Sequence, residues 1–441
     1  MKKAAYFAAM AYQLLLTFAV FIQSHGYAFH KVRANGKYHT ELVHILPLLA
    51  VGAALVLALE IASVFLDGEG RFVKLLVPVF LLLGTGIVFQ CICHEQTALR
   101  HIVRICIALA FGGVCFFCSA LAVSRRTFRN LLWAVIALSI LAVLTAVLFR
   151  RDRTGGTWGE LAKLLSIYLC AMAFPHIREL RQRRLFFITL AALLVSVVMM
   201  KDYGTAIVLL AITLCAMLYV SPALAVLTGL GAALLGGGGV LLLRLFSPGS
   251  YILQRIDACG KVLLNNEANE NFRQQLLSLV RGGMLGMGAS GTDAWYSIYA
   301  AASQHDFVFL SLTATLGIGI GLVVLLCYAA IGLECCDRRK ARTNKRALTV
   351  NVTGFALAFQ AAISILGQLN LIPLTGITCP FLAYGGSSLL ASSGMVGVAL
   401  AARLSAPELG SIQFYWDCIL DRLPGLSEHV QTRFRKAAHK Q

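Results

Sequence analysis

Long apolar stretches constrain this chain more than any other feature of its sequence. A helix that crosses a bilayer needs about 20 mainly apolar residues. Of the 441 residues, 59% are hydrophobic and 13% are charged, whereas soluble domains average about 25% charged residues. An ordinary globular enzyme, a nucleic-acid-binding protein and a disordered chain are therefore excluded, and the sequence predicts an all-α polytopic membrane protein. The predicted spans are 4–26, 41–66, 73–93, 101–122, 130–149, 159–176, 185–200, 203–219, 222–246, 306–333, 347–369 and 380–403.

Basic residues predict the orientation of these spans. The formal net charge is +18, and Lys and Arg are enriched in cytoplasmic loops of membrane proteins. An even number of spans places both termini on one side. A cytoplasmic N-terminus places the densest basic run, 338–346, inside, although the segments 31–37 and 150–153 then lie outside against the rule. We therefore expect both termini to be cytoplasmic.

Two segments lie outside the predicted spans. Residues 247–305 form a polar, glycine-rich loop on the outer side, and long loops on a rigid scaffold frequently carry function. Residues 405–441 form a basic cytoplasmic tail, which either lies on anionic lipid as an amphipathic helix or is solvated.

Ionisable residues at membrane depth are costly and are functional candidates by default. Glu160 and Lys163 share one helix face because they are three residues apart. They form either an internal ion pair, with Lys163 reaching outward to the interface, or a phosphate-binding pair that Glu160 orients. Asp202 favours capping of the helix that follows it, with Gly204 permitting a tight turn.

Two further clusters lie near the C-terminal spans. Asp306 follows His305 at the outer start of a span, where it is either a helix N-cap or a general base between a membrane-embedded donor and an aqueous acceptor hydroxyl. Pro380 is expected to open the last span. Gly385 and Gly386 inside that helix allow close backbone approach, and the serines after them can bond across helices.

The last of these clusters carries a resemblance. Residues 373–376, followed by Pro380-Phe381 and by 384–388, resemble the signature of the SEDS family of shape, elongation, division and sporulation proteins (FtsW, RodA and SpoVE). Four other segments resemble family motifs in the family's order, so that the similarity covers about residues 75–403. They are 159–163, 202–206, the glycine-rich loop at 282–288, and 306–309.

The resemblance implies a ten-helix SEDS core at 71–404, with the long extracellular loop 247–305, preceded by two additional transmembrane helices within 1–70. It also implies a peptidoglycan glycosyltransferase that polymerises lipid II into glycan strands at the outer face of the bacterial cytoplasmic membrane. Elongation, division and sporulation remain open as its role. A class B penicillin-binding transpeptidase is the implied partner, together with membrane lipids, and no nucleic acid.

The family's essential aspartate falls on Asp306. By analogy it would deprotonate the acceptor 4-hydroxyl, or help to hold a divalent cation such as Mg or Mn, while undecaprenyl pyrophosphate leaves. Because that leaving group is strongly negative, nearby cations should lower the barrier. The predicted substrate-binding residues are Glu160, Lys163, Arg255, Arg273, Gln274, Arg281, His305, Ser387 and Ser388. The predicted structural residues are Asp202, Gly204, Thr205, Gly282, Gly283, Gly286, Gly288, Pro373, Gly376, Pro380, Tyr384, Gly385 and Gly386.

Two alternatives stay open. Twelve spans are common in secondary transporters, so a flippase for lipid-linked precursors is one, although we find no repeat between the two halves of the chain. A non-catalytic scaffold for a transpeptidase is the other. It is favoured by Ala314 and Thr315, which stand where the family commonly has an acidic pair.

Overall fold

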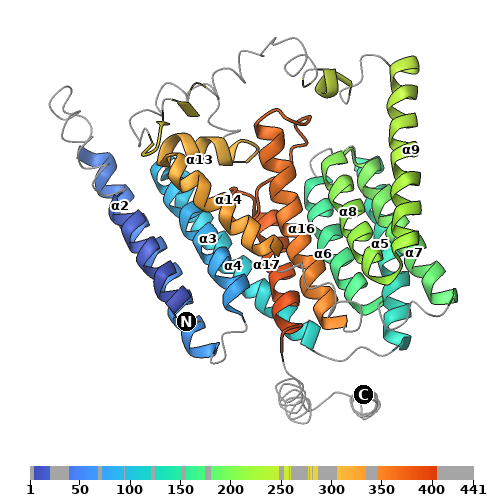
Figure 1. The fold of residues 1–441 in the computed structure, drawn as a ribbon, viewed down its shortest axis with the longest axis horizontal. Coiled ribbons are helices and arrows are strands. Elements are labelled where there is room, and N and C mark those ends of the chain that lie inside the picture. The colour runs from blue at the N-terminus through green and yellow to red at the C-terminus, as the bar shows by residue number, and fades with distance from the viewer. Residues whose placement is uncertain are drawn as a thin grey trace. The chain divides into compact units, whose positions relative to one another are not determined.

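In the computed structural model every longer regular element is a helix, among the residues that the structure describes (Figure 1). Those residues are 4–19, 39–67, 72–93, 95–120, 125–149, 155–173, 180–247, 253–257, 259, 277, 279–280, 282–286, 305–333 and 345–404. The longer helices are Ala4–Ala19 (the N-terminal helix), α2 (His39–Leu66), α3 (Val73–Cys93), α4 (Glu95–Ala120), α5 (Arg125–Phe149), α6 (Gly155–Ala173), α7 (Leu180–Met199), α8 (Tyr203–Val220), α9 (Pro222–Phe246), α13 (Val308–Leu316), α14 (Ile318–Leu333), α16 (Lys345–Gln368) and α17 (Gly386–Ala401). The all-α prediction is confirmed.

Each predicted span overlaps at least one of these helices. Within the described part of the chain, five helical segments are long and apolar enough to cross a membrane by length and composition, and several others are apolar but shorter. The five are Pro47–Phe65, Val73–Cys93, Thr97–Ala120, Ala225–Phe246 and Arg346–Gln368. The chain is a multi-pass membrane protein.

The chain divides into two compact units, and α4, α9, α16 and α17 each contribute residues to both. The first unit comprises residues 1–107, 226–334 and 356–389. The second comprises 108–225, 335–355 and 390–441.

Helix α3 is the centre of the first unit. It is apolar on all sides, as a buried helix must be, and it contacts α2, α13 and α14 (Figure 1). The contact with α2 is close at Gly52, where a β-carbon would overlap Ile87 of α3.

Helices α5 to α8 form the second unit's bundle (Figure 1), with α5 against α7 and α6 against α8. The side chain of Asp202 accepts a hydrogen bond from the Thr205 backbone N–H at 3.0 Å, which confirms its predicted capping of α8. The residue that permits the tight turn was wrongly predicted to be Gly204. Lys201 adopts the left-handed conformation, with φ of 60°, whereas Gly204 lies inside the first turn of α8.

The predicted continuous span 306–333 is wrong, because Gly317 separates α13 from α14 with φ of +99°. The glycine-rich loop 282–286 packs backbone to backbone against this break, and Ile318 N–H donates to Gly283 O at 2.9 Å. A β-carbon at Gly286 would lie 2.6 Å from Gly317 N, and one at Gly282 would lie 2.5 Å from Ala314 O. The glycines are therefore required by close backbone approach.

Replacing Gly317 with alanine is expected to destabilise the protein by about 1–3 kcal/mol, from left-handed strain and overpacking. The new methyl group would overlap Met284 O and lie 2.7 Å from Leu285 C. Gly319→Ala is the matched control, because its β-carbon would meet Met284 O at an ordinary 3.6 Å. Thermal unfolding in detergent measures both variants. Equal unfolding temperatures for the two would contradict the packing described.

The last span does not begin at Pro380, as the sequence predicts, but at Gly386, the first residue of α17. Gly385 therefore lies before the helix rather than inside it. Irregular backbone at membrane depth needs partners from the surrounding protein, and neighbouring helices provide them. Tyr328 Oη donates to Pro380 O at 2.5 Å, and Ser364 Oγ donates to Ile377 O at 2.8 Å.

Candidate functional site

Asp306 lies in the turn 305–307 that leads into α13, and its carboxylate is not the cap of that helix. The N-cap residue is Phe307, which makes no side-chain cap. The acceptor is instead the side chain of Gln368 on α16, whose Oε1 accepts from the backbone N–H groups of Phe309 at 3.0 Å and Leu310 at 3.2 Å. The N-cap alternative for Asp306 is therefore wrong, and its carboxylate is available for chemistry.

Gln368 was not predicted, and it holds the start of α13 in place. Its side chain is buried, and its Nε2 donates to Ser364 Oγ at 3.1 Å and to Cys379 Sγ at 3.6 Å. One amide thus joins α13 to α16 and to the irregular segment before α17.

The charges of two neighbouring side chains, His305 and Arg255, act on the Asp306 carboxyl. The pKa of this carboxyl lies above its ordinary value, because burial raises it more than the positive charges of His305 and Arg255 lower it. The pKa of His305 lies below its ordinary value, mainly because the ring is buried. The charge of Asp306 raises this pKa, and the charge of Arg104 lowers it further. Arg255 is anchored by its Nη1, which donates to Leu374 O at 2.5 Å.

The ring of Tyr384 contacts three ionisable side chains near Asp306. The guanidinium carbon of Arg104 lies 4.2 Å from the centre of its ring, within cation–π range. The rings of His101 and His305 each lie 5.7 Å from it, centre to centre. We call Asp306, His305, Arg255, Arg104 and Tyr384 the Asp306 cluster, and all five belong to the first unit.

The sequence predicted Arg255 and His305 for this site but did not point to Arg104 and the fully buried His101. Both lie on α4, three residues apart and thus on one face. Two ionisable residues on one face of an apolar helix are a signal that could have revealed them.

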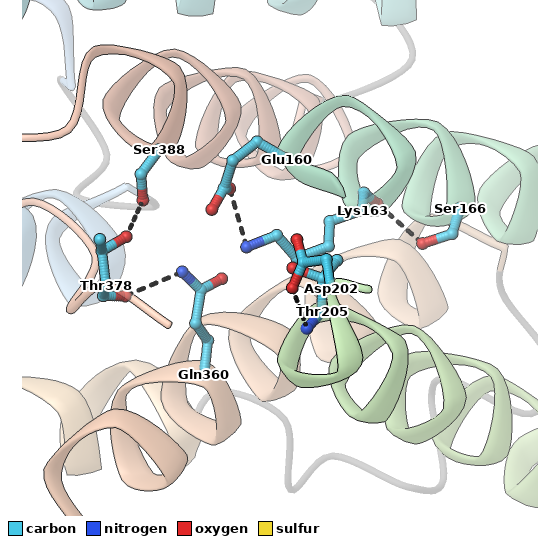
Figure 2. A network of polar contacts seen from close by, with 8 residues as sticks. All are labelled: Glu160, Lys163, Ser166, Asp202, Thr205, Gln360, Thr378 and Ser388. Atoms are coloured by element: carbon cyan, nitrogen blue, oxygen red, sulfur yellow. Dashed lines mark hydrogen bonds and ion pairs between the residues drawn. The ribbon is translucent and has the colours of Figure 1, made fainter. Parts of the chain in front are cut away.

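The serines after the double glycine differ in their surroundings. Ser388 is buried and its Oγ accepts from Thr378 Oγ1 at 2.8 Å, while Gln360 Nε2 donates to Thr378 O at 3.0 Å (Figure 2). This chain of hydrogen bonds ties the irregular segment to α16 and α17. Ser387 is only partly buried. Substrate binding by either serine stays a prediction.

Glu160 and Lys163 form a buried ion pair on α6 in the second unit (Figure 2), with 2.7 Å between Lys163 Nζ and Glu160 Oε2. The predicted internal ion pair is therefore confirmed, but the expectation that Lys163 reaches outward is wrong, because its side chain is 0% exposed. Gly159, beside the pair, packs against the α8 cap, because a β-carbon there would lie 2.5 Å from Asp202 Oδ2. The cap and the ion pair are therefore adjacent parts of one packed structure.

Some predicted residues lie outside the described part of the chain. They are Arg273, Gln274, Arg281 and Gly288, with most of the loop 247–305 and the tail 405–441. The predicted roles of these residues stay predictions.

The described residues do not by themselves form a metal site. Among them, no group of three or more His, Cys, Asp or Glu side chains could hold a metal ion. Arginine, which donates hydrogen bonds but offers no lone pair, supplies two members of the Asp306 cluster. A divalent cation stays a prediction, and we derive no step through one.

The fold and the site define a class: a polytopic, all-helical membrane protein with a partly buried carboxylate at a broken helix, among cationic and aromatic side chains. The family model described as "Cell cycle protein", FtsW/RodA/SpoVE, matches residues 71–407. The chain therefore belongs to the FtsW/RodA/SpoVE family, which is the SEDS family that the motifs predicted.

Curated relatives agree with this assignment. The chain is 31% identical over 309 residues to a probable peptidoglycan glycosyltransferase FtsW of Halorhodospira halophila, covering 64% of this chain and 74% of that one. It is 25% identical over 365 residues to the protein of the same name in Bacillus subtilis, covering 74% and 88%.

A solved structure shares the fold. It is described as "Structural coordination of polymerization and crosslinking by a peptidoglycan synthase complex", and one of its chains matches with a TM-score of 0.53. The two chains are 20% identical, and the match covers 74% of this chain and 96% of that one. The predicted SEDS-type fold is confirmed.

Proposed function

We propose that this protein is a peptidoglycan glycosyltransferase that polymerises lipid II at the outer face of the bacterial cytoplasmic membrane. One observation carries the proposal: the Asp306 carboxylate is released from helix capping by Gln368 and lies beside Arg255 and His305. Family membership and the names of the relatives support the same reaction class. In the proposed orientation both termini are cytoplasmic.

In the proposed reaction Asp306 is the general base. Its carboxylate accepts the proton of the acceptor sugar's 4-hydroxyl, and the oxygen forms a new bond to the anomeric carbon of the donor. The bond from that carbon to the pyrophosphate oxygen breaks, and undecaprenyl pyrophosphate leaves with the electron pair. Arg255, a fixed cation beside Asp306, stabilises the negative charge that develops on the leaving group.

The pH dependence of the reaction follows from the charges around Asp306. A general base works only when deprotonated, so activity is expected to be lost as pH falls through the raised pKa of Asp306. Arg255→Gln removes a cation, raises that pKa further and moves the acid limb of kcat/KM to higher pH. Arg255→Lys keeps the charge and is expected to leave the limb close to that of the wild type. An acid limb that stays in place, or moves down, in Arg255→Gln would contradict the role of Arg255.

We further propose a class B penicillin-binding transpeptidase as partner. The structural neighbour is described as a peptidoglycan synthase complex that coordinates polymerization and crosslinking. A protein that only makes strands depends on a second activity to crosslink them.

Reconstitution in vesicles with fluorescent lipid II, with and without a candidate transpeptidase, tests the proposal. We expect glycan strands on a gel. Movement of lipid II between leaflets without strands would favour the flippase alternative. Tight partner binding without strands under any condition would favour the scaffold.

A further inference from the structure

The N-terminal helix lies before the region that the family model matches, yet it is docked on the first unit. Its buried side chains recur at three- and four-residue spacing and define one face, while the opposite side is exposed. The buried residues are Tyr6, Ala9, Gln13 and Leu16, and the exposed ones are Phe7, Leu14, Leu15 and Phe18. The covered face therefore packs against protein, and the exposed apolar face suits lipid.

Gln13 is the centre of the covered face, and it faces a glycine of α3. Its side chain is 1% exposed. A β-carbon at Gly84 would overlap the Gln13 amide and lie 2.6 Å from its Cδ. One residue before Gln13 and one residue after Gly84, Tyr12 Oη and Thr85 Oγ1 share a hydrogen bond of 3.2 Å. Any side chain at position 84 would thus occupy the space of the Gln13 amide.

A second polar contact lies at the other end of the docked face. Tyr6 Oη donates to Asp67 Oδ2 at 3.1 Å, and the same oxygen accepts from Phe72 N–H at 3.0 Å, directly before α3 begins. The N-terminal helix is therefore held at two places, at Gly84 and Thr85 of α3 and at Asp67 in the segment before α3.

The other side of α3 faces the segment that carries Tyr384. Gly86 lies two residues after Gly84, which is about 200° around the helix. A β-carbon at Gly86 would lie 3.1 Å from Phe381 O and 3.3 Å from the Leu382 Cα. Phe381 itself has a left-handed backbone, with φ of 65°, so the path of this segment is closely constrained. Helix α3 is thus in contact with Gln13 on one side and with the backbone leading to Tyr384 on the other.

We propose that the packing of the N-terminal helix at Gly84 positions the Asp306 cluster. With Gln13 seated at Gly84, this packing holds α3 against Phe381 and Leu382 and so keeps Tyr384 in place beside Arg104 and His305. The additional N-terminal helix is then part of the active-site support rather than only an anchor. The catalytic consequence rests on the proposed glycosyltransferase function, whereas the positioning of Tyr384 is testable without it.

The test uses Gly84→Val in the full-length protein and two comparison variants. The new side chain displaces the Gln13 amide. The double variant Gln13→Ala with Gly84→Val removes that amide and makes room again. Gly113→Val is the matched control, because it places the same residue in a helix where a β-carbon meets nothing within 4 Å.

Hydrogen exchange of peptides covering 377–389 is the readout that does not need activity. Faster exchange is expected in Gly84→Val, and near wild-type exchange in the double variant and in Gly113→Val. On lipid II, Gly84→Val is expected to lower kcat at least about tenfold with KM within about twofold, since small misplacements of reacting groups cost rate. The double variant should recover most of that loss.

Two results would overturn the inference. One is a Gly84→Val protein that matches Gly113→Val in both exchange and kcat, and the other is a double variant no better than the single one. A wild-type protein that makes no polymer, but shows the expected exchange pattern, would refute the proposed function and leave the positioning of Tyr384 intact.

Discussion

Replacing Asp306 with asparagine is expected to lower the rate of lipid II polymerisation by about 10²–10⁴-fold, the usual contribution of a general base. Asparagine has nearly the same shape but cannot accept the proton. The fold should be preserved, because the N–H groups at the start of α13 are capped by Gln368 and not by Asp306. Initial rates of strand formation and thermal unfolding of the same preparations measure the two effects.

Asp202→Asn is the matched control for this experiment. It makes the same chemical change at a carboxylate that caps α8, and asparagine is an equally good N-cap. Polymerisation by this variant should stay close to that of the wild type. An Asp306→Asn protein that keeps most of its activity would contradict the general-base role, and one that fails to fold would contradict the capping described.

Breaking the Glu160–Lys163 ion pair is expected to cause the largest loss of stability among these variants. Lys163→Met leaves a largely buried carboxylate without its cation, which typically costs about 3–5 kcal/mol. Combining Lys163→Met with Glu160→Leu replaces the pair by apolar side chains and should recover most of that loss. Thermal unfolding in detergent follows the recovery.

Activity separates the two interpretations of this pair. If Lys163 meets a substrate phosphate, the stable double variant stays poorly active; if the pair only stabilises α6, the double variant is as active as the wild type. We expect the second outcome, because the Lys163 side chain is 0% exposed and its Nζ already pairs with Glu160. Ser166→Ala is the local control, because it removes only a hydroxyl that donates to Lys163 O at 2.7 Å, and it should change neither stability nor activity appreciably.

The helices were predictable from the sequence, because apolar length alone marks a membrane span. The breaks in them were not. Gly317 ends α13 because the loop at Gly283 and Gly286 lies against it, some 30 residues earlier in the chain. The segment before α17 is irregular because Tyr328 and Ser364, on other helices, bind its carbonyl groups. Such contacts between distant parts of the chain leave no local pattern.

The candidate site was predictable in part. The motif around Asp306 and the outer position of Arg255 identified three of its members, Asp306, His305 and Arg255. The N-cap alternative could be rejected only once Gln368, from α16, was seen to occupy the cap. Arg104 lies in a helix whose apolar residues dominate the pattern, and its place over Tyr384 depends on the path of the irregular segment. Side chains recruited by packing were therefore missed.

The release of undecaprenyl pyrophosphate from lipid II by the purified protein tests the central claim most directly. Each glycosidic bond formed must release one molecule of this lipid, so polymer and released lipid should rise together, in equal amounts per bond. Both should be lost in Asp306→Asn. Lipid II that remains intact in the presence of wild-type protein and its transpeptidase partner would contradict the proposed polymerase activity.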